Sequence, residues 1–181
     1  MKGMVFTEFL EMVEERFGID MVDDLIERAD LPVSQGAYTA VGTYPHEEMV
    51  SLVTELHKAT EVSVSDLLKT YGEHLFQRFV VGYPVFFENL DSSLAFLENI
   101  HDYIHVEVRK LYPDAELPEF RTTRVAENEL HMHYISERHM EDFAEGLILG
   151  CFKHFEEDGS IQSDKQGDGT TIFVVKVNSV K

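Results

Sequence analysis

The sequence has only one cysteine, Cys151, among its 181 residues. An internal disulfide is therefore impossible, and a reducing cytosol is the simplest location, so we predict a cytoplasmic protein. Cys151 falls within an apolar stripe of helical period. We interpret it as a small buried side chain rather than as a reactive thiol.

Basic residues and long hydrophobic runs are also scarce. The chain has 15 Lys and Arg against 34 Asp and Glu, which gives a formal net charge of -19. Such an acidic surface repels phosphate backbones and anionic lipid heads. No apolar run approaches the roughly 18 residues that a membrane-spanning helix needs. We therefore predict neither a nucleic-acid partner nor a membrane partner.

The common catalytic motifs are missing as well. The chain contains no GxSxG, no Walker-type phosphate loop, no CxxC and no HExxH. These motifs mark common hydrolases, nucleotide-binding enzymes, redox proteins and zinc proteases. Their absence removes the simplest enzyme interpretations, and we predict that the protein is not an enzyme.

What the chain does have is a clear change of hydrophobic period. Apolar residues recur at helical spacing up to Tyr112, and an alternating, strand-like pattern begins after Pro118. With 44% hydrophobic residues, the chain suits one α+β domain with a helical N-terminal part and a four-stranded antiparallel sheet covered by helices. Helices are expected over 1–18, from Asp20, from Pro45, from Ser63 to Gly72, from there to Gly82, over 96–112 and from Met140 to Gly159. Strands are expected over 120–126, over 129–136, from Ile161 and over 171–177.

Two histidines stand out on the helix expected over 96–112. His101 and His105 are four residues apart, so they point to the same side of that helix. Such a histidine can be a core residue, a pH switch, a zinc ligand or a haem ligand. Zinc would need further ligands, and the nearby candidates are Glu127, Glu129, His131 and His133.

A second pattern lies on the strand expected over 129–136. Tyr134, Ser136 and Arg138 are spaced by two, which places two hydroxyl groups and a guanidinium on one face of a strand. Such a row suits carboxylates, because arginine binds them bidentately and hydroxyls bind the remaining oxygens. The alternative is an edge strand whose polar residues simply face water.

Taken together, these features resemble the haem nitric oxide/oxygen binding (H-NOX) family, relatives of the sensor domain of soluble guanylate cyclase. The resemblance covers essentially the whole chain. It rests on the opening MKG, the segment HVEVRKLYPDAELPEF, the Tyr134-x-Ser136-x-Arg138 pattern and the helix after it. It implies one domain over 1–181, with a helical subdomain over about 1–60 and a haem-ligating helix and sheet over about 61–181.

The resemblance also implies roles for these residues around haem b, ferrous iron protoporphyrin IX. His105 precedes the Tyr-Pro pair as the family's iron ligand does, although the apolar period by itself slightly favours His101. Tyr134, Ser136 and Arg138 would hold the haem propionates. Pro118 matches a proline that packs against the haem and distorts it.

On the far side of the haem, the resemblance predicts apolar surroundings. Members of the family that hold oxygen have a tyrosine where this chain has Phe143. The other residues carried over to this side are Val5, Phe9, Leu75, Phe79 and Leu147. Bound dioxygen gains more from a hydrogen-bond donor than nitric oxide does. We expect binding of nitric oxide and carbon monoxide but no stable oxygen complex.

The function that the resemblance implies is gas sensing. Nitric oxide would release His105 from the iron, the helix that carries it would shift, and another protein would respond. By family analogy, that partner is a signalling histidine kinase or a cyclic-di-GMP enzyme. Two alternatives are a metal- or haem-dependent enzyme and an interaction module without a cofactor, in which His105 is a core residue.

Overall fold

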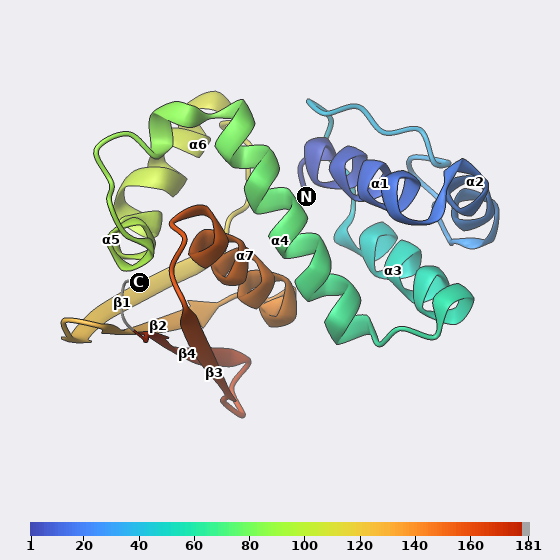
Figure 1. The fold of residues 1–181 in the computed structure, drawn as a ribbon. Helices are drawn as coiled ribbons and strands as arrows, with labels where there is room; N and C mark the ends of the chain where they lie inside the picture. The colour runs from blue at the N-terminus through green and yellow to red at the C-terminus, as the bar shows by residue number, and fades with distance from the viewer. Residues whose placement is uncertain (179–181) are drawn as a thin grey trace.

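The structure is a computed structural model that describes residues 1–178. It has a helical lobe and a sheet-containing lobe on either side of one long helix, α4 (Figure 1). This confirms the predicted α+β class. None of the described helices is both long enough and apolar enough to cross a bilayer.

The N-terminal lobe consists of three amphipathic helices, α1 (Gly3–Phe17), α2 (Ile19–Arg28) and α3 (His46–Thr60). Gly18 ends α1 with a φ of 88°, a conformation that glycine adopts without strain. Pro45 directly precedes α3 rather than forming its first residue. The apolar faces of the three helices form a core with part of α4, in which Phe6, Phe9, Leu52 and Leu56 are completely buried.

The central helix, α4 (Val64–Gly82), is continuous, so the predicted break at Gly72 is wrong. Ser63 caps it by accepting a hydrogen bond from the backbone N–H of Asp66 at 3.0 Å. A Cβ atom on Gly72 would lie 2.4 Å from the carbonyl oxygen of Phe143 in α7 (Glu141–His154). Gly72 therefore permits close contact between α4 and α7, and packing of this kind outweighs its low helix propensity.

The segment around the two histidines is the least regular part of the helical structure. One helix was predicted over 96–112, but the structure divides it into α5 (Ser93–Glu98), a π-helical turn η2 (Ile100–Ile104) and α6 (His105–Leu111). A short 3-10 turn, η1 (Pro84–Phe86), connects α4 to this region. A π turn within a helix often marks a functional site, and here it comes immediately before His105.

The four strands are β1 (Glu119–Ala126), β2 (Glu129–Ile135), β3 (Gly159–Lys165) and β4 (Thr170–Val177). They form an antiparallel sheet in the order β1-β2-β4-β3. Since β2 is an interior strand, the edge-strand interpretation of its polar residues is wrong. The strand also ends at Ile135, so Ser136 and Arg138 lie in the turn that follows it rather than in a strand row.

Helix α7 packs against α4 and the sheet. It ends at His154, earlier than predicted, and Gly159 begins β3 instead of ending the helix. Cys151 on this helix is completely buried and burial raises its pKa well above the usual value, as expected for an unreactive thiol.

Candidate functional site

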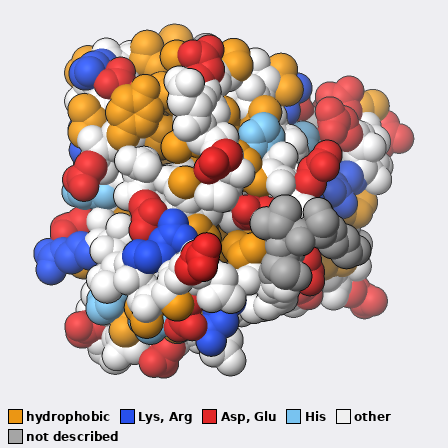
Figure 2. Space-filling view, turned by 60° about the vertical axis from the view of Figure 1, so that its left-hand side comes forward, with side chains coloured by type: hydrophobic (Ala, Val, Ile, Leu, Met, Phe, Trp, Pro, Cys, Tyr) orange, Lys and Arg blue, Asp and Glu red, His pale blue; other side chains and the backbone are white. Residues whose placement is uncertain are grey.

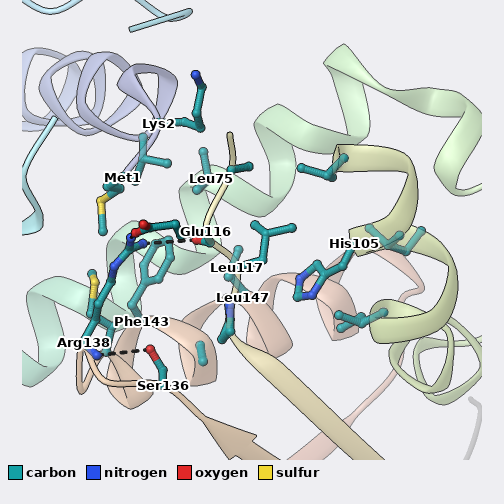
Figure 3. A pocket seen from close by; sticks show the side chains of 18 of the residues that line it. Met1, Lys2, Leu75, His105, Glu116, Leu117, Ser136, Arg138, Phe143 and Leu147 are labelled. Atoms are coloured by element: carbon teal, nitrogen blue, oxygen red, sulfur yellow. Dashed lines mark hydrogen bonds and ion pairs between the residues drawn. The ribbon is translucent and has the colours of Figure 1, made fainter. Parts of the chain in front are cut away.

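A cavity of about 1210 Å³ lies between the two lobes. It is bounded by α1, α4, η2, α6, the loop that leads to β1, the end of β2 and α7. Figure 3 shows His105 projecting into it from one side and Arg138 lying at the opposite end. Apolar side chains make up most of the wall, including Leu75, Phe79, Ile104, Leu117, Phe143 and Leu147.

His105 has the properties of a side chain that is available to bind a metal ion. Its ring projects into the cavity, and its Nδ1 atom is buried without a hydrogen bond of good geometry to the described residues. Burial, aided by Arg109 and His101 and opposed by the carbonyl of Pro118, lowers the pKa of His105 to about 4. The imidazole is therefore neutral at physiological pH, which is the form that binds a metal ion.

His101 is placed differently. It does not line the cavity, and its Nδ1 atom accepts a long, 3.5 Å hydrogen bond from the backbone N–H of Phe120. The rings of His101 and His105 are 6.4 Å apart between centroids. The spacing of apolar residues slightly favoured His101 as the ligand, but His105 is the histidine that lines the cavity.

The opposite end of the cavity carries the polar residues that the sequence singled out. Tyr134, Ser136 and Arg138 all line it. The guanidinium of Arg138 donates to the backbone carbonyl of Glu116 at 3.2 Å and pairs with the Glu116 carboxylate, while the backbone N–H of Arg138 donates to Ser136 Oγ at 3.2 Å. Burial raises the pKa of Tyr134, so its hydroxyl stays protonated and can donate. This end can therefore bind carboxylate groups.

The remaining predicted residues also surround the cavity, with one exception. Val5, Leu75, Phe79, Pro118, Phe143 and Leu147 line it. Phe9 does not, because its completely buried ring packs edge-on against Tyr71, with centroids 5.2 Å apart, in the core of the N-terminal lobe. Its helical spacing from Val5 gave no sign that it lies one layer deeper.

Tyr71 is a residue near the apolar wall that the sequence analysis missed. Its ring is completely buried and stacks on Phe143 at 5.1 Å between centroids. Its hydroxyl donates to the backbone carbonyl of Val5 and is thereby occupied. Tyr71 therefore supplies no free donor to the cavity.

Two further tyrosines, Tyr83 and Tyr112, were also missed. Both line the cavity, and their hydroxyl oxygens are 2.9 Å apart. Tyr112 belongs to the Tyr-Pro pair that marked the end of the helix, but nothing in the sequence indicates that its partner lies 29 residues earlier.

The alternative zinc site finds no support in the residues that the structure describes. None of them forms a group of three or more potential ligands that could hold a metal ion. His131 pairs instead with Glu129 at 2.8 Å, and Glu129 also pairs with Lys176 at 3.0 Å.

Comparison with known proteins identifies similar chains. The family described as "Haem-NO-binding" matches residues 2–163. The unliganded Fe(II) H-NOX protein from K. algicida is 42% identical, with 99% of this chain and 98% of that chain covered and a TM-score of 0.93. No curated protein matches the chain.

Two structures with bound gases are also similar. The H-NOX protein from Shewanella woodyi, in its Fe(II)CO state with IWP-051 bound, is 38% identical, with 97% of this chain and 94% of that chain covered and a TM-score of 0.83. The Fe(II)NO state of an H-NOX protein from S. oneidensis is 25% identical, with 99% of this chain and 100% of that chain covered and a TM-score of 0.91.

Proposed function

Because this chain belongs to the Haem-NO-binding, or H-NOX, family of haem-based gas sensors, we propose that it senses nitric oxide through haem b held in the cavity between its lobes. The single observation that carries this proposal is His105, a neutral imidazole that projects into that cavity. When bound, the haem supplies the iron at which nitric oxide and carbon monoxide bind.

The chemistry of the cavity fits such a group. Its walls are mostly apolar, as a porphyrin face requires, and its polar residues gather at one end. We propose that His105 is the iron ligand and that Tyr134, Ser136 and Arg138 hold the propionates. Arg138 already pairs with the Glu116 carboxylate and would then bind a propionate as well. The Glu116 side chain is 81% exposed, so it can move aside into solvent. Pro118 would pack against the porphyrin.

The wall formed by α1, α4 and α7 supports the proposed choice of gas. Val5, Leu75, Phe79, Phe143 and Leu147 offer no hydrogen-bond donor from their side chains, and the hydroxyl of nearby Tyr71 is occupied by the Val5 carbonyl. Bound dioxygen needs such a donor more than nitric oxide or carbon monoxide does. We therefore propose that oxygen forms no stable complex.

The output would come from α6. This helix carries His105, has no fully buried side chain and follows a π turn, so its packing opposes a shift only weakly. Release of His105 from the iron would let α6 move, and a partner would respond to the new surface. We propose a cytoplasmic signalling histidine kinase or cyclic-di-GMP enzyme as that partner. Acidic side chains are spread over the surface in Figure 2, so a basic docking patch on the partner would be complementary.

The test is the absorption spectrum of the ferrous protein under argon, air, carbon monoxide and nitric oxide. We expect a Soret band that shifts with carbon monoxide and with nitric oxide but remains unchanged in air until the iron oxidises. A stable oxygen spectrum would contradict the proposed selectivity. A purified protein that acquires no Soret band after haem is supplied would rule out haem binding altogether.

A further inference from the structure

Helix α6, which carries His105, is held differently at its two ends. At its start, the π turn η2 contributes the buried side chain of Ile104. Along its length, α6 contributes no buried side chain of its own. Val108 packs against the core only partly buried, so apolar burial holds this part of the helix less firmly than its start, and polar contacts contribute to where its far end lies.

The far end of α6 makes one hydrogen bond to the central helix through two tyrosine hydroxyls. Tyr112 directly follows α6, and its backbone N–H donates to the carbonyl of Val108 at 2.8 Å. Tyr83 directly follows α4, and its backbone N–H donates to the carbonyl of Phe79 at 2.8 Å. Since the two hydroxyl oxygens are 2.9 Å apart, they connect the end of α6 to the end of α4.

Each tyrosine ring is held by a further contact. The two hydroxyls can therefore meet only when α6 lies close to its present position. The Tyr83 ring stacks on Phe86 with centroids 5.6 Å apart and an angle of 13°. The Lys2 ammonium lies 5.5 Å from the centroid of the Tyr112 ring. Burial, together with the hydrogen bond that the Tyr83 hydroxyl makes to Tyr112, raises the pKa of Tyr83 to about 12, so the bond persists at any physiological pH.

We propose that the Tyr83–Tyr112 hydrogen bond is a latch that holds α6 in the position in which His105 reaches the iron. This inference rests on the gas-sensing function proposed above and adds the residues that set its threshold. Tyr83 and Tyr112 are positioning residues: they act through the helix and not on the gas. Opening the latch lowers the barrier to the shift of α6 and so makes release of His105 easier.

The effect should be modest because the loop after α6 has a second attachment. Asp114 accepts hydrogen bonds from Lys2 Nζ at 3.1 Å and from Thr43 Oγ1 at 2.7 Å. Loss of the latch should therefore leave the protein folded. One hydrogen bond of ordinary strength corresponds to a change of about twofold to tenfold in rate or equilibrium.

The experiment uses Tyr83→Phe, Tyr112→Phe and the double variant in the haem-loaded protein, because phenylalanine keeps each ring and removes only the hydroxyl. Release of His105 after nitric oxide is added is followed through the Soret band in a stopped-flow instrument. Hydrogen exchange of the backbone amides of residues 106–111 is measured without nitric oxide. We expect each single variant to increase both rates about twofold to tenfold. The double variant should add nothing further, because both substitutions break the same bond.

The matched control is Tyr103→Phe, which removes the hydroxyl of a tyrosine 43% exposed on η2 and should change neither rate. If the wild-type protein shows release but the latch variants match it in both rates, the latch is wrong while the sensor function stands. Additive effects of the two single variants would also overturn the latch. If the wild-type protein binds haem but does not release His105 after nitric oxide, the proposed function itself fails.

Discussion

The N-terminal lobe and the segment around His105 are stabilised in opposite ways. In the N-terminal lobe, α1, α2 and α3 each bury several side chains, and Phe6, Phe9, Leu52 and Leu56 are completely inaccessible. In α6, no side chain is fully buried, and the preceding π turn breaks the regular helix. One region is a packed core, whereas the other borders a large cavity and depends on polar contacts.

This difference suggests that the N-terminal lobe provides stability and that α6 provides the movement. A packed interior resists displacement because any shift opens voids or creates overlaps. A helix on the edge of a cavity can move without either cost, provided that something else sets its resting position. The N-terminal lobe can therefore act as a fixed frame against which α6 moves. Substitutions in the two regions should consequently affect different measurements.

The largest expected effect is on cofactor binding, from His105→Gly. Loss of the proposed iron ligand should reduce haem retention at least about tenfold. Because no side chain of α6 is fully buried, the free energy of unfolding of the haem-free protein should fall by only about 1 kcal/mol, the usual cost of glycine in a helix. Haem transfer to an excess of a haem-scavenging protein measures the first quantity, and urea unfolding measures the second. His101→Ala is the control, and a greater loss of haem in that variant would show that the wrong histidine was assigned.

The next effect is on stability, at the contact where α4 meets α7. A Cβ atom on Gly146 would lie 2.2 Å from the carbonyl oxygen of Lys69, and backbone there cannot move aside easily. Gly146→Ala should therefore destabilise the protein by about 1–3 kcal/mol or more, as measured by urea unfolding. Gly167→Ala is the matched control, because an added Cβ there would meet no atom within 4 Å. Equal stability of the two variants would contradict the close packing described here.

A smaller effect should come from the buried carboxylate of the N-terminal lobe. Glu48 is 1% exposed and accepts hydrogen bonds from the backbone N–H groups of Val33 and Ser34, at 2.8 and 3.0 Å, and from the Tyr38 hydroxyl at 2.8 Å. Burial alone would raise the pKa of Glu48, but these hydrogen bonds outweigh it and lower the pKa below its usual 4.5. Glu48→Gln should cost about 1–3 kcal/mol at neutral pH.

The same carboxylate should give the stability of the lobe a defined pH dependence. Since the pKa of Glu48 is lower in the folded than in the unfolded state, its stabilisation is complete above the unfolded value of 4.5 and is lost as the pH falls through the folded value. The gap in unfolding free energy between wild type and Glu48→Gln should therefore narrow below about pH 4.5. Glu47→Gln, on a neighbouring side chain that is 74% exposed, is the control and should show no such gap.

The smallest effect should come from adding one donor to the cavity wall. Phe143→Tyr places a hydroxyl on a ring that lines the cavity and is fixed by stacking on Tyr71. We expect oxygen affinity to rise by no more than about tenfold, since one hydrogen bond is added. Absorption spectra under increasing oxygen pressure measure it, with Phe143→Leu as the control. Equal gains in both variants would mean that space, not a hydrogen-bond donor, limits oxygen binding.

Much of the fold could be predicted because most of these helices and strands bury one face, so the spacing of their apolar residues shows which type of element they form. The change from helical to alternating spacing located the sheet, and Gly18 ended α1 as expected. Gly72 led to a wrong prediction of a helix break because its role is to allow close contact with α7, which lies about 70 residues later in the chain. The helix around the histidines was predicted whole because a π turn changes hydrogen bonding without changing which residues are apolar.

The residues of the candidate site were found to different extents. His105, Tyr134, Ser136 and Arg138 could be singled out because their side-chain chemistry is distinctive and the family pattern fixes their spacing. Phe9 was predicted to line the cavity because the family resemblance carried it over, but its position along the chain does not show how deep its side chain lies.

The sequence by itself determined the α+β class, the excess of acidic residues and the positions at which the chain resembles its family, His105, Tyr134, Ser136 and Arg138 among them. These follow from composition, period and order along the chain. Only the tertiary structure decided that the hydroxyl of Tyr71 is occupied by the Val5 carbonyl and that Tyr83 meets Tyr112. Each of these depends on which atoms of distant segments come within hydrogen-bonding distance, and local sequence does not encode that distance.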